Sequence, residues 1–268
     1  MKVNPQLHTF FMDAIPFVRI REKTDGGFGA TPRLPATIED TYHALHILHH
    51  ARQYLATNEI GFTPDREEVL RSYLAVRRIT LPAGLRTTFQ LLWCCRAAGM
   101  KIVNETLSAS VLAKLQASDL LEDWYYGIRI ISELLGKKLL MSTISPDFPS
   151  ILDKEWRTVN EAWRHIYLFW KLKNILPWAK PELISWFQAC QNGDGGFGFF
   201  PGTTSFVENC HASLRSLEFL GSKPLEPLRA YRFLASCQTI SGGFGRSSRA
   251  VPFLDTTWHA LASLIIIT

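Results

Sequence analysis

Apolar residues recur along this chain with the three-to-four-residue spacing of amphipathic helices, and short Gly- or Pro-containing segments separate these stretches. No segment alternates apolar and polar residues for long enough to indicate a β-sheet. The pattern therefore predicts an all-α protein. Its helices are expected near residues 5–20, 37–56, 65–78, 86–98, 106–117, 122–135, 158–173, 180–191, 206–220, 225–237 and 253–267, with a weaker one near 148–156.

A Gly-Gly-Phe-Gly (GGFG) segment occurs three times, at residues 26–29, 195–198 and 242–245, and the last two copies have a spacing typical of repeat proteins. The helices pair into six hairpins, and one hairpin buries its apolar face only by stacking on a neighbour. Aligning the second helices on their C-terminal ends gives one shared position per hairpin. The residues at this position are His43, Phe89, Tyr126, Arg164, His211 and His259.

Six stacked hairpins can close into a ring, with the first helix of each hairpin outside and the second inside. A closed ring has no exposed ends, which agrees with the lack of distinct polar terminal repeats in the sequence. We therefore expect residues 1–268 to form a single α/α-toroid domain, a six-hairpin α-α barrel whose shared positions face a central cavity.

Composition narrows the classes of protein. A hydrophobic content of 47% and eight Trp supply a core, and a charged content of 20% argues against disorder. The net charge of +5 is spread along the chain without a Lys/Arg block, so we expect no nucleic-acid partner. The five cysteines form no CxxC pair, and with no signal peptide we expect reduced thiols and a cytoplasmic location. The longest apolar run, residues 260–267, is too short to span a bilayer.

Three segments carry a family resemblance. Residues 233–244 and 186–197 resemble the QW-type repeat of the squalene-cyclase and protein-prenyltransferase β-subunit superfamily, with Phe in place of the final Trp. Residues 17–28 are a degenerate copy with Glu22 in place of Gln. The resemblance implies the terpenoid cyclase/prenyltransferase-like toroid, while the middle of the chain, 65–175, is supported by repeat spacing alone. In this repeat the Gln is expected to cap exposed carbonyls at the C-terminus of the outer helix, the glycines to form a tight turn, and the aromatic ring to pack between hairpins.

The resemblance also implies a zinc site. Protein prenyltransferases hold a catalytic zinc with an Asp-x-Cys at the start of one inner helix and a His on the next. Here Glu208 and Cys210 stand at the first two positions and His259 at the third. Carboxylate, thiolate and imidazole with one open position suit catalytic zinc, so Cys210 and His259 are the implied catalytic residues and the metal would bind a substrate thiol. The alternative is structural, because Ser205-x-x-Glu208 has the pattern of a helix capping box, as does Thr158-x-x-Glu161.

Inner-helix residues are the candidates for substrate binding. A cavity lined by aromatic side chains suits an isoprenoid chain. The expected substrate-binding residues are His43, Tyr126, Arg164, His211 and Trp258.

The residues that bind the diphosphate in prenyltransferases, a basic pair before the Asp-x-Cys, are replaced here by Gly202 and Ser205. Arginines elsewhere could bind a diphosphate instead. The candidates are Arg86 and Arg164 on inner helices, and Arg246 and Arg249 in the loop after the last GGFG segment.

Three functions follow from this reading. The first is a prenyltransferase β-subunit-like protein that binds an isoprenoid diphosphate, transfers the chain to a thiol and works with a helical α-subunit partner. The second is a metal-independent, terpene-cyclase-like enzyme that protonates its substrate with one helix-start acid. The acids concerned are Asp40, Asp123, Glu161, Glu208 and Asp255. The third is a non-catalytic toroid that binds an isoprenoid or a protein partner.

Overall fold

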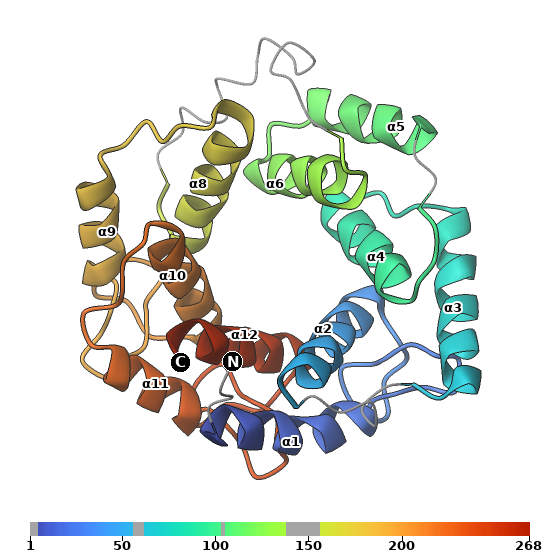
Figure 1. Ribbon diagram of the computed structural model, residues 1–268, viewed down its shortest axis with the longest axis horizontal. Coiled ribbons are helices and arrows are strands. Elements are labelled where there is room, and N and C mark those ends of the chain that lie inside the picture. The colour runs from blue at the N-terminus through green and yellow to red at the C-terminus, as the bar shows by residue number, and fades with distance from the viewer. Residues whose placement is uncertain (1–4, 56–61, 103–104, 138–155) are drawn as a thin grey trace.

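A computed structural model of the chain describes residues 5–55, 62–102, 105–137 and 156–268. Its helices form two concentric rings (Figure 1). The inner ring contains α2 (Ile38–Leu55), α4 (Leu85–Ala97), α6 (Leu121–Arg129), α8 (Val159–Lys173), α10 (Val207–Phe219) and α12 (Leu254–Ile267). The outer ring contains α1 (Pro5–Arg19), α3 (Pro64–Ile79), α5 (Glu105–Gln116), α9 (Lys180–Ala189) and α11 (Pro227–Ser236). The predicted all-α toroid is thereby confirmed.

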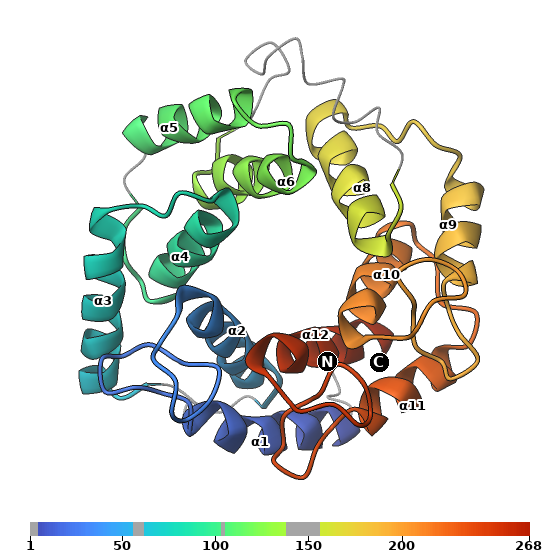
Figure 2. The same ribbon diagram turned by 180° about the vertical axis from the view of Figure 1, so that it is seen from behind.

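The inner ring is closed. Each inner helix packs against the next, and α12 packs against α2, so the last hairpin meets the first. Helix α1 also contacts α12, so the first and last hairpins lie next to each other, as the view of the ring from behind shows (Figure 2). None of the helices in the described ranges is long and apolar enough to cross a membrane.

The helix boundaries follow the predictions with one informative difference. The segment 122–135 was expected to be one helix, but α6 ends at Arg129 and continues as a π-helical turn, η1 (Ile130–Leu134). The wider turn closes with a hydrogen bond from the Leu135 N–H to the Ile130 carbonyl, at 3.0 Å. Of the weaker helix predicted near 148–156, only Trp156 lies within the described residues, and it is not helical.

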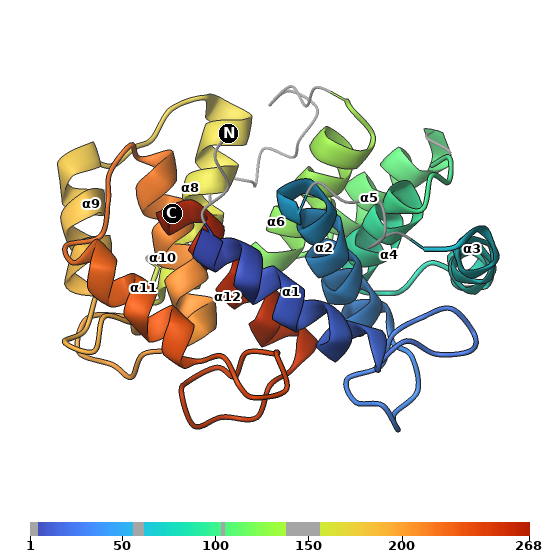
Figure 3. The ribbon, with the colours of Figure 1, turned by 60° about the horizontal axis from the view of Figure 1, so that its bottom comes forward.

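Each GGFG segment forms the tight turn at the end of an outer helix, and the three turns lie along one edge of the ring (Figure 3). The second residue before each Phe is a glycine with positive φ, 96° at Gly26, 92° at Gly195 and 85° at Gly242. The three phenylalanines are fully buried. The Phe244 ring contacts Phe10 of α1 with 5.8 Å between centroids, and the Phe28 ring contacts Phe62, just before α3, with 6.3 Å, so both rings pack against the following hairpin, as the motif predicted.

The Gln of the motif links neighbouring hairpins. Gln191 donates to the carbonyls of Gly195 and Glu226, each at 3.1 Å, and accepts from the Glu226 N–H at 3.0 Å, immediately before α11 begins. In the degenerate copy, Glu22 makes the same connection by an ion pair with Arg66 on α3, at 3.1 Å. The Gln was expected to cap carbonyls at the C-terminus of its own outer helix, whereas the two carbonyls that it contacts lie in the turn and immediately before the next outer helix.

Candidate functional site

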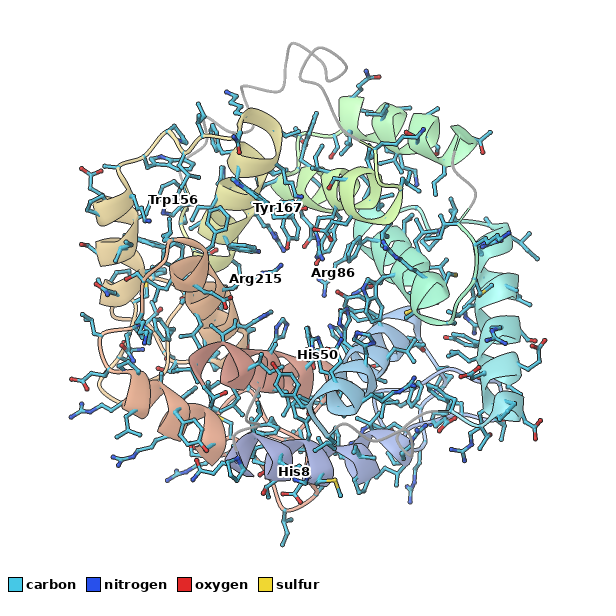
Figure 4. The ribbon with its side chains drawn as sticks, viewed as in Figure 1. His8, His50, Arg86, Trp156, Tyr167 and Arg215 are labelled. Atoms are coloured by element: carbon cyan, nitrogen blue, oxygen red, sulfur yellow. The ribbon has the colours of Figure 1, made fainter. Side chains whose placement is uncertain are left out.

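A cavity of about 390 Å³ lies inside the inner ring, and all six inner helices contribute side chains to its wall (Figure 4). The five residues expected to bind substrate all line it, namely His43, Tyr126, Arg164, His211 and Trp258. Phe89, which shares their repeat position, is instead fully buried in the core. The repeat position therefore identified wall residues correctly in most hairpins, and their role in substrate binding stays a prediction.

Four arginines line the cavity, one from each of four consecutive inner helices: Arg86, Arg129, Arg164 and Arg215. The first three have acidic partners. Arg86 pairs with Glu39, Arg164 with Glu122 at 2.7 Å, and Arg129 with Glu133 at 3.0 Å.

Arg215 differs from the other three. It is in no ion pair among the described residues, and its guanidinium lies 4.6 Å from the centroid of the Trp163 ring. It points toward the middle of the ring (Figure 4). Sequence reasoning found Arg86 and Arg164 but missed Arg129 and Arg215, although Arg129 lies three residues after Tyr126 and Arg215 four after His211, one turn along the same helix face.

The π-helical turn η1 positions Arg129 through the side chain of Glu133. Glu133 accepts hydrogen bonds from Arg129 Nε at 3.0 Å and from the Tyr167 hydroxyl at 2.6 Å. Arg129 in turn donates to the Tyr125 hydroxyl at 3.5 Å, and Trp163 Nε1 donates to the same oxygen at 3.2 Å. One chain of hydrogen bonds therefore connects α6, η1 and α8 and ends at the Tyr125 hydroxyl on the cavity wall.

The opposite side of the cavity is formed by α2 and α12 and carries a cluster of imidazole rings. Four histidines come from these two helices, His43, His46, His50 and His259, and His211 adjoins them from α10. Their packing is tight. The His46 ring stacks on Trp93 with 3.5 Å between centroids, and both of its ring nitrogens are buried without a hydrogen-bond partner.

These histidines are neutral at pH 7. Burial lowers the pKa of His50 and of His259 to about 4, and it lowers the pKa of His43, His46 and His211 well below the ordinary value. Trp258, Ile265 and Ile266 complete this side of the wall. The cavity therefore has a cationic side on α4 to α10 and an uncharged, largely apolar side on α2 and α12.

The three implied zinc ligands are not brought together. The Cys210 sulfur is fully buried and accepts a hydrogen bond from the Phe197 N–H at 3.3 Å, and Glu208 pairs with Arg246. His259 Nδ1 lies 2.9 Å from Nδ1 of His211 instead. Throughout the described ranges, no three His, Cys, Asp or Glu side chains are grouped so that they could hold a metal ion. The donor atoms as placed do not fit a zinc site.

Cys210 has a structural equivalent in each of the other two GGFG repeats. The Phe28 N–H donates to the Thr41 hydroxyl at 3.0 Å, and the Phe244 N–H donates to the Thr257 hydroxyl at 2.9 Å. Cys210 makes the same contact with Phe197, at the same sequence distance from its turn. Its position in the fold is therefore that of a hydrogen-bonding threonine.

The predicted capping boxes have different outcomes. Thr158 and Glu161 form one at the start of α8. The box predicted at Ser205 and Glu208 is wrong, because α10 begins at Val207 and the Ser205 hydroxyl donates to Asp194 at 2.8 Å. Glu208 is thus held by an arginine, not by the helix backbone.

The helix-start acids stay out of the cavity. Asp123 accepts from the Ser118 hydroxyl at 2.7 Å, and Asp255 accepts from the Thr256 N–H at 2.7 Å. Within the described part of the cavity wall, Glu218 is the one acid, and it is exposed at the end of α10. Arg246 and Arg249, in the loop after the last GGFG turn, are not part of the wall.

Comparison with known proteins agrees with this architecture. A family model described as the prenyltransferase alpha-alpha toroid domain matches residues 6–85, 167–229 and 209–268. Among solved structures, the chain is similar to Candida albicans protein geranylgeranyltransferase-I complexed with GGPP, with a TM-score of 0.63 and 15% sequence identity, covering 85% of this chain and 83% of that one. No curated protein sequence matches the chain.

Proposed function

Because the chain belongs to the prenyltransferase alpha-alpha toroid domain family, we propose that it binds an isoprenoid diphosphate in the central cavity and transfers the isoprenoid to a thiol of a second substrate. The similar Candida albicans protein was solved with GGPP, which supports this class of ligand for the present fold. The observation that carries the proposal is the division of the cavity into a cationic side and an uncharged side.

The charge distribution favours one end of the cavity for the diphosphate. Arg86, Arg129 and Arg164 are each paired with one glutamate, whereas no acid is paired with Arg215 in the described residues. Guanidinium groups bind phosphate oxygens in bidentate fashion and keep their charge at all relevant pH values. The diphosphate is therefore assigned to Arg215, together with Arg129, which lines the same part of the cavity beside Tyr125.

The hydrocarbon chain is assigned to the α2 and α12 side. Its wall contains neutral imidazole and indole rings together with Ile265 and Ile266, and it holds no charged group at neutral pH. Apolar walls with a few placed polar groups are typical of sites for small lipophilic ligands.

The acceptor thiol comes from another molecule, because the chain offers no reactive thiolate of its own. All five cysteines are buried. Burial raises the pKa of Cys190 and of Cys237 to about 12, and it also raises the pKa of the Cys210 thiol. Thiols are nucleophilic as thiolates, so these side chains are unreactive near pH 7. Since the implied zinc ligands do not fit a metal site, no step is assigned to zinc.

The acid-initiated cyclase is the weaker alternative, because the helix-start acids that it needs do not line the cavity. A helical α-type partner remains part of the proposal, and native mass spectrometry of the protein purified from its source tests it. A non-catalytic toroid would bind the isoprenoid diphosphate but release no inorganic diphosphate when a thiol is added.

The decisive test is ligand-dependent stability. GGPP should raise the melting temperature of the protein, and inorganic diphosphate or geranylgeraniol alone should raise it less, because each fills one side of the cavity. Arg215→Ala should weaken GGPP binding about 10- to 100-fold, the effect of losing hydrogen bonds to a charged group. Arg249→Ala, an exposed arginine outside the cavity, is the matched control and should bind normally. No stabilisation of the wild-type protein by GGPP would refute the proposed function.

A further inference from the structure

The Tyr125 hydroxyl occupies an unusual place in the cavity. Trp163 Nε1 and Arg129 both donate to its oxygen, so the oxygen serves as an acceptor for two fixed donors. Its own O–H proton has no acceptor in the described residues. Tyr167 and Arg129 donate to Glu133, so these two side chains already have an acceptor in the network. The proton of Tyr125 is a donor that the network leaves unused.

The surroundings of Tyr125 are strongly cationic. The guanidinium of Arg129 lies 5.3 Å from the centroid of its ring, and that of Arg164 lies 5.9 Å from the same centroid. Arg215 approaches from α10 across the Trp163 ring. The other titratable groups that face it from the packed elements are Glu133 on η1, Tyr167 on α8, Tyr126 on α6 and Tyr42 on α2. An unused donor among arginines is complementary to an anion that carries acceptor oxygens.

The chemistry of this tyrosine differs from that of the other six in the chain. Burial alone would raise the pKa of the Tyr125 phenol, but Arg129, Arg215 and the hydrogen bond from Trp163 outweigh it, so its pKa is lowered. Each of the other tyrosines has a raised pKa, with burial as the largest cause. A buried phenol that is nonetheless a better acid suits proton donation.

We propose that Tyr125 is the general acid of the transfer reaction and donates its proton to the diphosphate oxygen that leaves carbon 1 of the isoprenoid. This inference rests on the proposed function, since it assigns the diphosphate to the arginines beside Tyr125. The bond between carbon 1 and the leaving oxygen breaks, and its electron pair stays on the oxygen, which takes the phenol proton. Arg129 and Trp163 stabilise the resulting phenolate. The acceptor sulfur forms the new bond to carbon 1 with its own electron pair, and its proton returns to the phenolate, so no further reactant is needed.

The first test is an ultraviolet titration that needs no acceptor substrate. Of the seven tyrosines, one should ionise below the ordinary value near pH 10, and Tyr125→Phe should remove that transition. Inorganic diphosphate should shift it upward, because a bound anion disfavours the phenolate. Tyr73→Phe removes a buried hydroxyl from outer helix α3 and should leave the transition unchanged. If Tyr125→Phe leaves the transition in place, or diphosphate does not move it, the inference is wrong.

The second test measures release of inorganic diphosphate from GGPP with N-acetylcysteine as the thiol. Tyr125→Phe should lower kcat about 10²- to 10⁴-fold with little change in KM, and the fall in wild-type kcat at alkaline pH should disappear in the variant. A variant with the wild-type rate, or with weakened GGPP binding as its main defect, overturns the role as an acid. If diphosphate shifts the phenol transition but GGPP neither stabilises the protein nor reacts, the proposed function fails while the anion contact of Tyr125 stands.

Discussion

In each GGFG turn the backbone N–H of the Phe donates a hydrogen bond to one side chain of the following inner helix. The N–H groups of Phe28, Phe197 and Phe244 are buried and need an acceptor, because an unpaired buried donor costs about 1–3 kcal/mol. Two repeats supply a threonine hydroxyl, and the third supplies the Cys210 sulfur. The physical demand at this position is for a small side chain that can accept a hydrogen bond.

This demand gives a prediction for Cys210. Cys210→Thr should keep the free energy of unfolding within about 1 kcal/mol of wild type, because a hydroxyl takes over the contact that Thr41 and Thr257 already make. In Cys210→Val the side chain has the shape of threonine but no hydrogen-bond acceptor, so this variant should be about 1–3 kcal/mol less stable than Cys210→Thr. Urea unfolding of the two variants measures the difference. Stoichiometric zinc in the wild-type protein that disappears in Cys210→Thr would instead make Cys210 a metal ligand.

Helix α2 presents three histidines, His43, His46 and His50, to the cavity, and all three are neutral in the folded protein. In the unfolded chain a histidine takes up a proton below about pH 6.5. The folded protein does not protonate His50 until about pH 4, so the unfolded state binds more protons between these values. The stability that depends on these histidines being neutral is therefore fully present above about pH 6.5 and is lost as the pH falls toward 4.

The predicted consequence is a pH dependence that one substitution reduces. His50→Gln removes a titrating group, and the variant should lose on the order of 1 kcal/mol less stability than wild type between pH 7 and pH 5. Thermal unfolding at a series of pH values gives both slopes. Parallel curves for wild type and His50→Gln would show that His50 has the same pKa in the folded and unfolded states, which would contradict the prediction.

The elements were predictable to the extent that their determinants are local. Helical periodicity and the GGFG turns predicted the order of the helices, the two rings and part of the cavity wall, whereas His46, His50, Arg129 and Arg215 were missed. The π-helical turn after Arg129 was not predictable, since the periodic pattern of 122–135 continues through it. That turn places Glu133 beside Arg129, so that the two side chains form an ion pair. Cys210 was predicted to bind a metal because it was compared with the zinc motif of a family. Comparison with Thr41 and Thr257, which occupy the same position in the other two GGFG repeats of this chain, would have predicted its hydrogen bond instead.

Closure of the ring depends on the contact between the last hairpin and the first. The turn at Gly242 lies directly on α1, and a Cβ built on Gly242 would lie 1.9 Å from the Asp13 carbonyl oxygen. Tyr231 on α11 donates to Gln6 on α1 at 2.6 Å. Figure 3 shows α1 lying between α11 and α2, over α12. The seam that closes the ring is therefore a close backbone contact that tolerates no side chain at this glycine.

A pair of glycine variants separates this contact from backbone strain. Gly202 has the same φ of 85° as Gly242, but nothing lies within 4 Å of its missing Cβ. Gly202→Ala should cost about 1–2 kcal/mol, the strain of a left-handed residue with a side chain. Gly242→Ala should cost about 1–3 kcal/mol beyond that, because α1 must also move. Equal losses in urea unfolding would mean that the seam is looser than the structure shows.

The position of α12 in the chain has a consequence for biosynthesis. This helix contributes Trp258 and His259 to the cavity and completes the contact with α2, yet it is translated after every other described helix. On the ribosome the earlier hairpins can form only an open arc, whose first and last apolar faces have no partner. A nascent chain therefore cannot enclose the central cavity until synthesis has passed Ile267, and until then those two apolar faces are exposed to chaperones.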